Sequence, residues 1–279
     1  MLVSRFTMSV WLFAGLLSAS FVVAQEPAIN GTVPGALVPG APTVLQINGG
    51  NLAVAKKLWL SLPAEVALAE GIDKNGQNPA QVTYKVTLPA DTPCGINAIR
   101  VVTDKGVSPL KMVFVDDLPS VASVGSNVQL GTAQTLVVPT AVDGSVAALS
   151  WQYFKFNAKA GQRLTIEALA RRIGSSLDPI LRLLDAKGRE LAYNDDTPGL
   201  SGDASIIYTF KDAGEYVVEL RDIKYGAGAY RLRVGDFPIA TVAYPMAVQR
   251  GTATNVTLVG FGVDGLAPIT LAVPPSYSS

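Results

Sequence analysis

Five aspartates and one asparagine between the apolar runs of the central third of the chain are the best candidates for chemistry. They are Asp178, Asn194, Asp195, Asp196, Asp203 and Asp222. Carboxylate and amide oxygens on loops are the ligands that Ca²⁺ prefers, about six to eight around each ion. The spacing is not that of an EF-hand, and aspartates in turns also cap their own backbone, so both interpretations stay open. The pattern predicts Ca²⁺ as a cofactor, with these six residues as the metal site.

The same acids are poor candidates for hydrolysis. Asp195 and Asp196 are consecutive, so in an extended chain their side chains point to opposite sides and do not converge on one bond. A pair formed by Asp178 and Asp195 stays open. The chain contains no histidine, which removes Ser-His-Asp and Cys-His catalysis and histidine-ligated zinc. Cys94 is the only cysteine and has no base to activate it. We expect no enzyme and no catalytic residues.

The charge and one glycine motif bear on nucleotide partners. The formal net charge is zero at pH 7, which gives no electrostatic reason to expect nucleic acid as a partner. Residues 260–265 match the letters of a dinucleotide-binding GxGxxG motif. That motif requires a following helix to hold the pyrophosphate, whereas here Pro268 and another strand-like stretch follow. We therefore expect no nucleotide cofactor.

Short strands are the elements that must position these residues. Runs of β-branched and aromatic residues alternate with Gly, Pro, Asn and Asp, without a sustained helical period, which favours an all-β fold of tandem β-sandwiches. One exception is 63–71, which could form one or two helical turns. The clearest strand-like runs are 43–48, 82–88, 98–103, 153–157, 163–168, 206–210, 216–221 and 230–234.

The N-terminus has the pattern of a secretory signal peptide. Arg5 precedes an uncharged apolar run over 6–23, which ends in Val22-Val23-Ala24. Small residues at that point suit signal peptidase, so we predict a signal peptide over 1–24, although an uncleaved anchor stays open. No later stretch is apolar and long enough to span a bilayer. We expect a protein that is secreted, periplasmic or on the cell surface.

An internal repeat divides the rest of the chain. Pro34, Gly40 and Gly49 recur with the same spacing at Pro245, Gly251 and Gly260. The first copy, with Asn51 and the sequence VTLPADTPCGINAIRVVTDKGVS at 86–108, resembles the IPT/TIG family of immunoglobulin-like domains, whose members are mostly binding or spacer modules. We predict such a domain over 25–118 and the incomplete start of a second over 239–279. Either that copy belongs to a longer protein or it packs on the preceding domain.

The middle of the chain resembles the bacterial pre-peptidase C-terminal (PPC) domain. The resemblance implies a jelly-roll-like β-sandwich over 119–238, with calcium at its acidic loops in some relatives. Many relatives have an acid where this chain has Gln152, which would weaken such a site. The matching segments are AQTLVVP (133–139), WQYFKFNAKAGQRLTIEA (151–168), SLDPILRLLDAKGRELAYNDD (176–196), DAGEYVVELRD (212–222) and YRLRVG (230–235).

These features together predict a secreted, non-catalytic binding or accessory protein whose partner is an extracellular protein or a polysaccharide. An alternative is the non-catalytic portion of a larger exported peptidase or other hydrolase, and another is a cell-surface adhesin. Aromatic side chains could form a flat binding surface or could pack in the core. The aromatic residues in question are Trp59, Trp151, Tyr153, Phe154 and Phe156.

Overall fold

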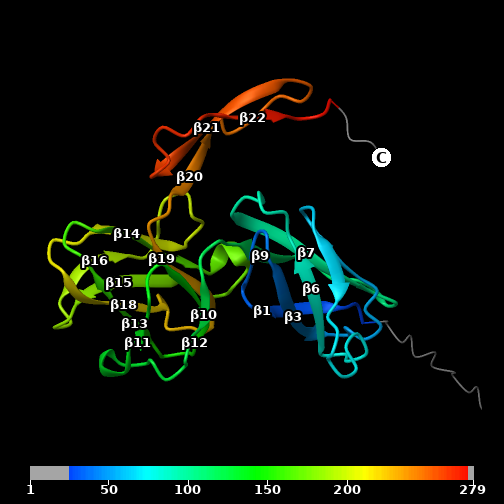
Figure 1. The fold of residues 1–279 in the computed structure, drawn as a ribbon, viewed down its shortest axis with the longest axis horizontal. Coiled ribbons are helices and arrows are strands. Elements are labelled where there is room, and N and C mark those ends of the chain that lie inside the picture. Colours follow the sequence, from blue (N-terminus) through cyan, green and yellow to red (C-terminus); the bar gives the residue numbers. More distant parts are fainter. Residues whose placement is uncertain (1–24, 276–279) are drawn as a thin grey trace, which may run out of the picture.

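The computed structural model describes residues 25–275 and consists of two β-sandwiches and a three-stranded sheet, joined in chain order (Figure 1). The all-β tandem-sandwich prediction is confirmed. The predicted signal peptide, residues 1–24, lies outside the described residues. Within the described part of the chain, no helix is long and apolar enough to cross a membrane.

The first sandwich encloses a core between a four-stranded and a five-stranded sheet. Its buried centre includes Leu45 and Ile47 from one sheet and Ile99 and Val101 from the other. The first sheet has the order β1 (Ala28–Val33), β3 (Pro42–Gly50), β6 (Gln81–Thr87), β5 (Glu65–Leu68). The second has the order β2 (Ala36–Leu37), β9 (Lys111–Val115), β7 (Gly95–Thr103), β4 (Lys57–Leu60), and β8 (Gly106–Val107) pairs with β7.

One local prediction in this sandwich was wrong. The segment 63–71 forms no helical turn; it contains the edge strand β5, which pairs antiparallel with β6. The reason is tertiary, because Val66 packs against the core of the sandwich. Burial of that side chain and pairing with β6 outweigh the helical preference of the Ala and Glu residues around it.

The second sandwich pairs two five-stranded sheets around a larger core. Phe154 and Phe156 face this core together with Phe210, whereas Trp151 and Tyr153 do not. One sheet has the order β10 (Ser120–Ala122), β12 (Thr140–Val146), β19 (Gly228–Gly235), β14 (Arg163–Leu169), β17 (Ala204–Thr209). The other has the order β11 (Gln134–Thr135), β13 (Gln152–Ala158), β18 (Gly214–Asp222), β15 (Pro179–Asp185), β16 (Glu190–Asn194).

Two short 3₁₀ turns interrupt this sandwich. The first is η1 (Leu130–Thr132), and the second is η2 (Arg171–Ile173), which follows β14 and ends at Gly174 with φ of 78°. Positive φ at this position favours glycine, because a side chain there would be strained. The turn η2 thus brings two arginines to the end of the sheet that faces the first sandwich.

The three-stranded sheet repeats the start of the first sandwich. It has the order β20 (Ile239–Tyr244), β21 (Ala253–Phe261), β22 (Ile269–Ala272). The bulge between Ile29 and Gly31 in β1 recurs between Ala240 and Val242 in β20. At both bulges the glycine of the partner strand has no room for a Cβ atom, which would meet the carbonyl oxygen of Ala28 or Ile239. The repeated glycines are therefore required by close backbone approach.

In the second copy, β22 takes the place that β6 has in the first. The face of this sheet lacks the cover that a second sheet gives the first copy, since Ile269 and Leu271 are both more than two-fifths exposed. The start of β20 packs on the second sandwich, where Ile239 forms a small cluster with Leu200 and Phe237. Arg163 also lies over the ring of Phe261, 4.7 Å from its centroid.

Candidate functional site

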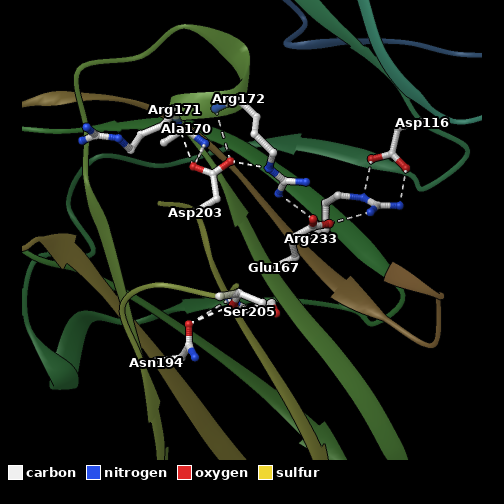
Figure 2. A network of polar contacts seen from close by, with 10 residues as sticks. Asp116, Glu167, Ala170, Arg171, Arg172, Asn194, Asp203, Ser205 and Arg233 are labelled. Carbon is white, nitrogen blue, oxygen red and sulfur yellow. Dashed lines mark hydrogen bonds and ion pairs between the residues drawn. The ribbon is translucent and has the colours of Figure 1, made fainter. Parts of the chain in front are cut away.

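Asp203, one of the six predicted metal ligands, is fully buried and engaged by the protein (Figure 2). Its Oδ1 accepts hydrogen bonds from the backbone N–H groups of Ala170 (3.0 Å) and Arg171 (2.8 Å). Its Oδ2 accepts one from Nε of Arg172 at 2.7 Å. The carboxylate therefore holds the turn η2 in place, and both of its oxygens are occupied.

Asp222 has a similar structural role at the end of β18. Its carboxylate accepts hydrogen bonds from the backbone N–H groups of Asp178, Lys224 and Gly226, all at 2.8 Å. Burial opposes ionisation of this group, but the three amides outweigh it and hold the pKa of Asp222 below its ordinary value. Asp178 in turn forms an ion pair with Arg171, 3.1 Å from oxygen to nitrogen.

The remaining three predicted ligands are Asn194, the last residue of β16, and the two residues that follow it. The side-chain oxygen of Asn194 accepts a hydrogen bond from the Thr197 hydroxyl at 2.9 Å. Asp195 accepts one from the Tyr193 hydroxyl at 3.0 Å. Asp196 lies close to Gly202 and Arg171. A Cβ atom added to Gly202 would contact the side chains of both Arg171 and Asp196.

The structure does not bring the six predicted ligands together as one donor set. Among residues 25–275, no three of the predicted acids place ligand oxygens within 4.8 Å of one another; the group that does so is Cys94, Asp116 and Asp117. Burial, followed by the charge of Asp117, raises the pKa of the Cys94 thiol, which disfavours the thiolate that a metal requires. Ca²⁺ stays a prediction, and Asp195 and Asp196 are the two of its six ligands that, within the described residues, neither accept a backbone amide hydrogen bond nor pair with an arginine.

A buried ion network joins the two sandwiches, and sequence reasoning missed it. Asp116, completely buried just after β9, receives hydrogen bonds from two arginines of β19. Arg233 binds both of its oxygens, with Nε and Nη2 each at 3.1 Å (Figure 2). Arg231 adds bonds of 2.9 and 2.8 Å from Nε and Nη2. One carboxylate of the first sandwich is thus held by two guanidinium groups of the second.

The network continues through the second sandwich. Glu167 of β14 lies opposite Arg233 in the sheet and accepts a 2.7 Å bond from its Nη1. The other oxygen of Glu167 accepts a 2.7 Å bond from Arg172, which also binds Asp203 (Figure 2). Because buried charges are costly unless each has its partners, this chain of alternating acids and arginines restricts how the two sandwiches can be oriented.

A partly apolar cleft of about 470 Å³ lies beside this junction. It is lined by the end of β1, the strand β10 and parts of β12 and β19. Its main charged groups already satisfy each other, since Nη1 of Arg231 lies 2.7 Å from Asp143. The Asp143 carboxylate also accepts a 3.0 Å bond from the N–H of Gly35. These contacts occupy Arg231 and Asp143, which leaves Lys111 as the charged lining residue without an ion pair in the part of the chain that the structure describes.

The outer face of the sheet β13-β18-β15-β16 carries a row of aromatic and charged side chains. The strand register places Tyr153, Glu219, Arg182 and Tyr193 side by side across the four strands. Their neighbours along each strand point into the core, so this row points outward. Tyr193 is 47% exposed. The row therefore places Glu219 and Arg182 between two tyrosine rings, and Glu219 is the most buried of the four at 4% exposed.

Ion pairs and hydrogen bonds fix the side chains of this row. Arg182 donates 2.7 Å and 3.0 Å bonds to Glu190 and Glu219. Burial, followed by the hydrogen bond to Glu219, raises the pKa of Tyr153 to about 12, so its hydroxyl stays protonated at neutral pH. Since these contacts hold the side chains before any ligand arrives, little side-chain entropy remains to be lost on binding.

Two further aromatic residues extend the row at one end. Trp151 precedes β13 and contacts Tyr225 edge to face, with ring centroids 5.9 Å apart. The guanidinium of Arg221 lies over the Tyr225 ring, 5.1 Å from its centroid. We call Trp151, Tyr153, Arg182, Tyr193, Glu219, Arg221 and Tyr225 the aromatic face. Of the aromatic residues considered from the sequence, Trp151 and Tyr153 lie on this face, Trp59 lies in the first sandwich, and Phe154 and Phe156 lie in the core.

Comparisons with known proteins place the second sandwich in a family. Residues 152–222 match the model of the bacterial pre-peptidase C-terminal domain. A probable subtilase-type serine protease of Deinococcus radiodurans is 42% identical over 69 residues. This alignment covers 24% of the chain and 9% of that protease, so the chain spans only a small part of this relative.

Solved structures give weaker similarities. The pre-peptidase C-terminal domain of a Bacillus anthracis collagenase is 18% identical, with a TM-score of 0.32 over 37% of this chain and 93% of that one. A Bacteroides ovatus protein, SGBP-B, solved with a mixed-linkage heptasaccharide, is 12% identical, with a TM-score of 0.25 over 75% of this chain and 74% of that one. The family assignment therefore rests on the sequence match: this chain carries a bacterial pre-peptidase C-terminal domain, matched at residues 152–222.

Proposed function

We propose that this protein is a secreted, non-catalytic accessory module that binds an extracellular polysaccharide on the aromatic face. The observation that carries the proposal is the row Tyr153–Glu219–Arg182–Tyr193 across four strands. Aromatic rings cover the apolar faces of sugar rings, while arginine and carboxylate groups form paired hydrogen bonds with neighbouring hydroxyls. A flat sheet surface suits a polymer better than a small ligand.

The ion network supports this proposal because it fixes the orientation of the two sandwiches relative to each other. Asp116, Arg231 and Arg233 connect the sandwiches, and loss of the Asp116 carboxylate would leave two buried arginines without their shared partner. Because the two sandwiches are held in one orientation, the aromatic face keeps a fixed direction relative to the first sandwich. We propose that the first sandwich acts as a spacer and the second as the binding module.

Secretion is supported by the leader pattern over 1–24 and non-catalysis by the absence of histidine from the chain. The match to part of a probable subtilase-type protease supports a second candidate function. In that candidate, the chain is the non-catalytic portion of an exported peptidase and directs it to its substrate. Both candidates assign the same role to the aromatic face, so one binding experiment serves both.

The experiment is a depletion assay with the full secreted chain. The protein is incubated with insoluble polysaccharides, including cellulose, chitin, xylan and mixed-linkage glucan, and with collagen and elastin fibres. Removal of protein from solution by at least one polysaccharide, in a manner that saturates, supports the proposal. Binding to protein fibres alone would replace polysaccharide with a fibrous protein as the partner, and binding to none of them contradicts the proposal.

A further inference from the structure

A slot in the first sandwich, far from the aromatic face in sequence, has the features of a small-molecule site. It lies where the two sheets end, between the edge strand β4 of one sheet and the edge strand β5 of the other. Neither strand has a second hydrogen-bonded neighbour within residues 25–275. The slot has a volume of about 460 Å³, within the range of about 300–1,000 Å³ for ligand pockets.

Most of the residues that line the slot have apolar side chains. Leu60 and Val66, one from each edge strand, both line the slot and pack on the core of the sandwich. Leu62 and Ala64, from the connection between the strands, do the same. An apolar body placed between these side chains would lose its contact with water, which is the main source of affinity in pockets of this kind.

One polar group in this wall has no partner. Tyr84 lines the slot and is 98% buried, being 2% exposed. Its hydroxyl is the one buried side-chain polar atom in the described part of the chain that forms no hydrogen bond. Leaving such a donor unpaired destabilises the fold. The side chains around this hydroxyl cover it almost completely, so a ligand that brings an acceptor oxygen to it must displace them before the new hydrogen bond can recover that loss.

The rim has one sign of charge. Lys56 and Lys57 line the slot and are exposed, whereas no acidic residue lines it. Trp59 is 40% exposed and also lines it. An anion at this rim would be attracted by both lysines with little loss of their hydration, because their side chains stay in water.

We propose that this slot binds a small amphiphilic carboxylate, with its apolar body between β4 and β5, its carboxylate at Lys56 and Lys57, and a hydroxyl or carbonyl oxygen accepting a hydrogen bond from Tyr84. The three parts of such a ligand correspond to the apolar walls, the cationic rim and the unpaired donor. This site is separate from the aromatic face of the second sandwich and does not depend on polysaccharide binding.

Isothermal titration calorimetry with the full chain tests the proposal, using decanoate, decanol and a series of hydroxydecanoates that differ in the position of the hydroxyl. Decanoate should bind more tightly than decanol, and the difference should shrink at high salt. At least one hydroxydecanoate should bind about five-fold more tightly than decanoate, which is the gain expected from one net hydrogen bond.

Tyr84→Phe removes the hydroxyl and keeps the ring. It should abolish the preference for the hydroxydecanoate, leave decanoate binding unchanged and raise the melting temperature, because the unpaired donor is gone. The double variant Lys56→Gln, Lys57→Gln should remove the preference for decanoate over decanol, whereas Lys105→Gln, an exposed lysine outside the slot, should not. Ala64→Leu, which fills the slot, should weaken all three ligand types.

Two results would overturn the proposal. The first is that no member of the series binds the wild-type chain at millimolar concentration. The second is that the hydroxydecanoate preference is absent, or persists in Tyr84→Phe, since the hydroxyl would then have no part in recognition. Because Tyr84→Phe keeps the ring in the core, its folding is checked by its melting curve before each titration.

Discussion

Arg233 holds Asp116 across the junction of the two sandwiches with two parallel hydrogen bonds of 3.1 Å each. The same guanidinium lies between the rings of Phe114 and Phe237, 5.0 and 3.9 Å from their centroids. Two residues of the first sandwich, Asp116 and Phe114, and Phe237 from the segment before the third sheet thus meet at one cation of the second sandwich. We infer that the relative orientation of the modules depends on this contact.

The first prediction concerns that contact. Asp116→Asn leaves Arg231 and Arg233 buried without their shared carboxylate, so the free energy of unfolding should fall by about 3–5 kcal/mol. Chemical denaturation followed by circular dichroism measures this change. The matched control is Asp117→Asn, an exposed neighbour, which should change stability by no more than about 0.5 kcal/mol. Equal effects of the two substitutions would show that the network does not stabilise the junction.

The second prediction concerns the repeated glycines. Gly49→Ala places a Cβ atom against the carbonyl of Ala28, whereas Gly50→Ala meets nothing within 4 Å. The first substitution should lower the stability of the first sandwich by about 1–3 kcal/mol. The second should leave it within about 0.5 kcal/mol. Melting curves of the two variants make the comparison, and a harmless Gly49→Ala would show that the bulge relaxes easily.

The third prediction concerns acid. The pKa of Asp222 in the folded protein lies below its value in the unfolded chain. A group of this kind stabilises the fold fully above the unfolded pKa, and the contribution disappears as the pH falls through the folded pKa. Asp222→Asn should therefore be less stable than the wild type at pH 7, with the gap narrowing below about pH 4.

Melting temperatures between pH 2 and 7 measure this gap. Asp212→Asn serves as the control, because Asp212 is an exposed acid in the turn at the opposite end of β18. A gap between wild type and Asp222→Asn that stays constant over the whole range would mean that the three amide hydrogen bonds do not favour the ionised form.

The fourth prediction concerns calcium. Asp203, Asp222 and Asn194 accept hydrogen bonds from backbone amides and Asp178 pairs with Arg171, so Asp195 and Asp196 are the predicted Ca²⁺ ligands to test. Millimolar Ca²⁺ should raise the melting temperature through binding to the native state, and Asp195→Ala with Asp196→Ala should abolish the shift. Absence of any shift in the wild type removes Ca²⁺ as a cofactor.

The sequence predicted the architecture well because the strands are local patterns. Alternation around Phe154 and Phe156, and turns closed by glycines such as Gly161 and Gly188 with φ of 76° and 77°, are set by neighbouring residues. The repeat was visible because close backbone approach demands glycine at Gly49 and Gly260. The alternation, the glycine turns and the repeat can each be recognised in the sequence without knowing which strands pair in the sheets.

The contacts that cross between strands could not be predicted in the same way. Glu167 and Arg233 lie 66 residues apart in the chain and meet only because β14 and β19 are adjacent. The acidic loop residues looked equivalent in sequence, yet Asp203 is buried by η2 and Asp195 is not. The one available signal was the alternation of Arg231 and Arg233 with apolar residues, which marks a charged face on a central strand.

The most direct test of the central claim is the affinity of single-site variants of the aromatic face for the polysaccharide identified by depletion. Tyr193→Ala and Arg182→Ala should each weaken binding at least about ten-fold, as expected for anchor residues at an interface. The control Tyr244→Ala removes a 69% exposed tyrosine from β20 and should leave the affinity unchanged. Unchanged affinity in both face variants, with all three proteins folded, would contradict the claim that this face binds the polymer.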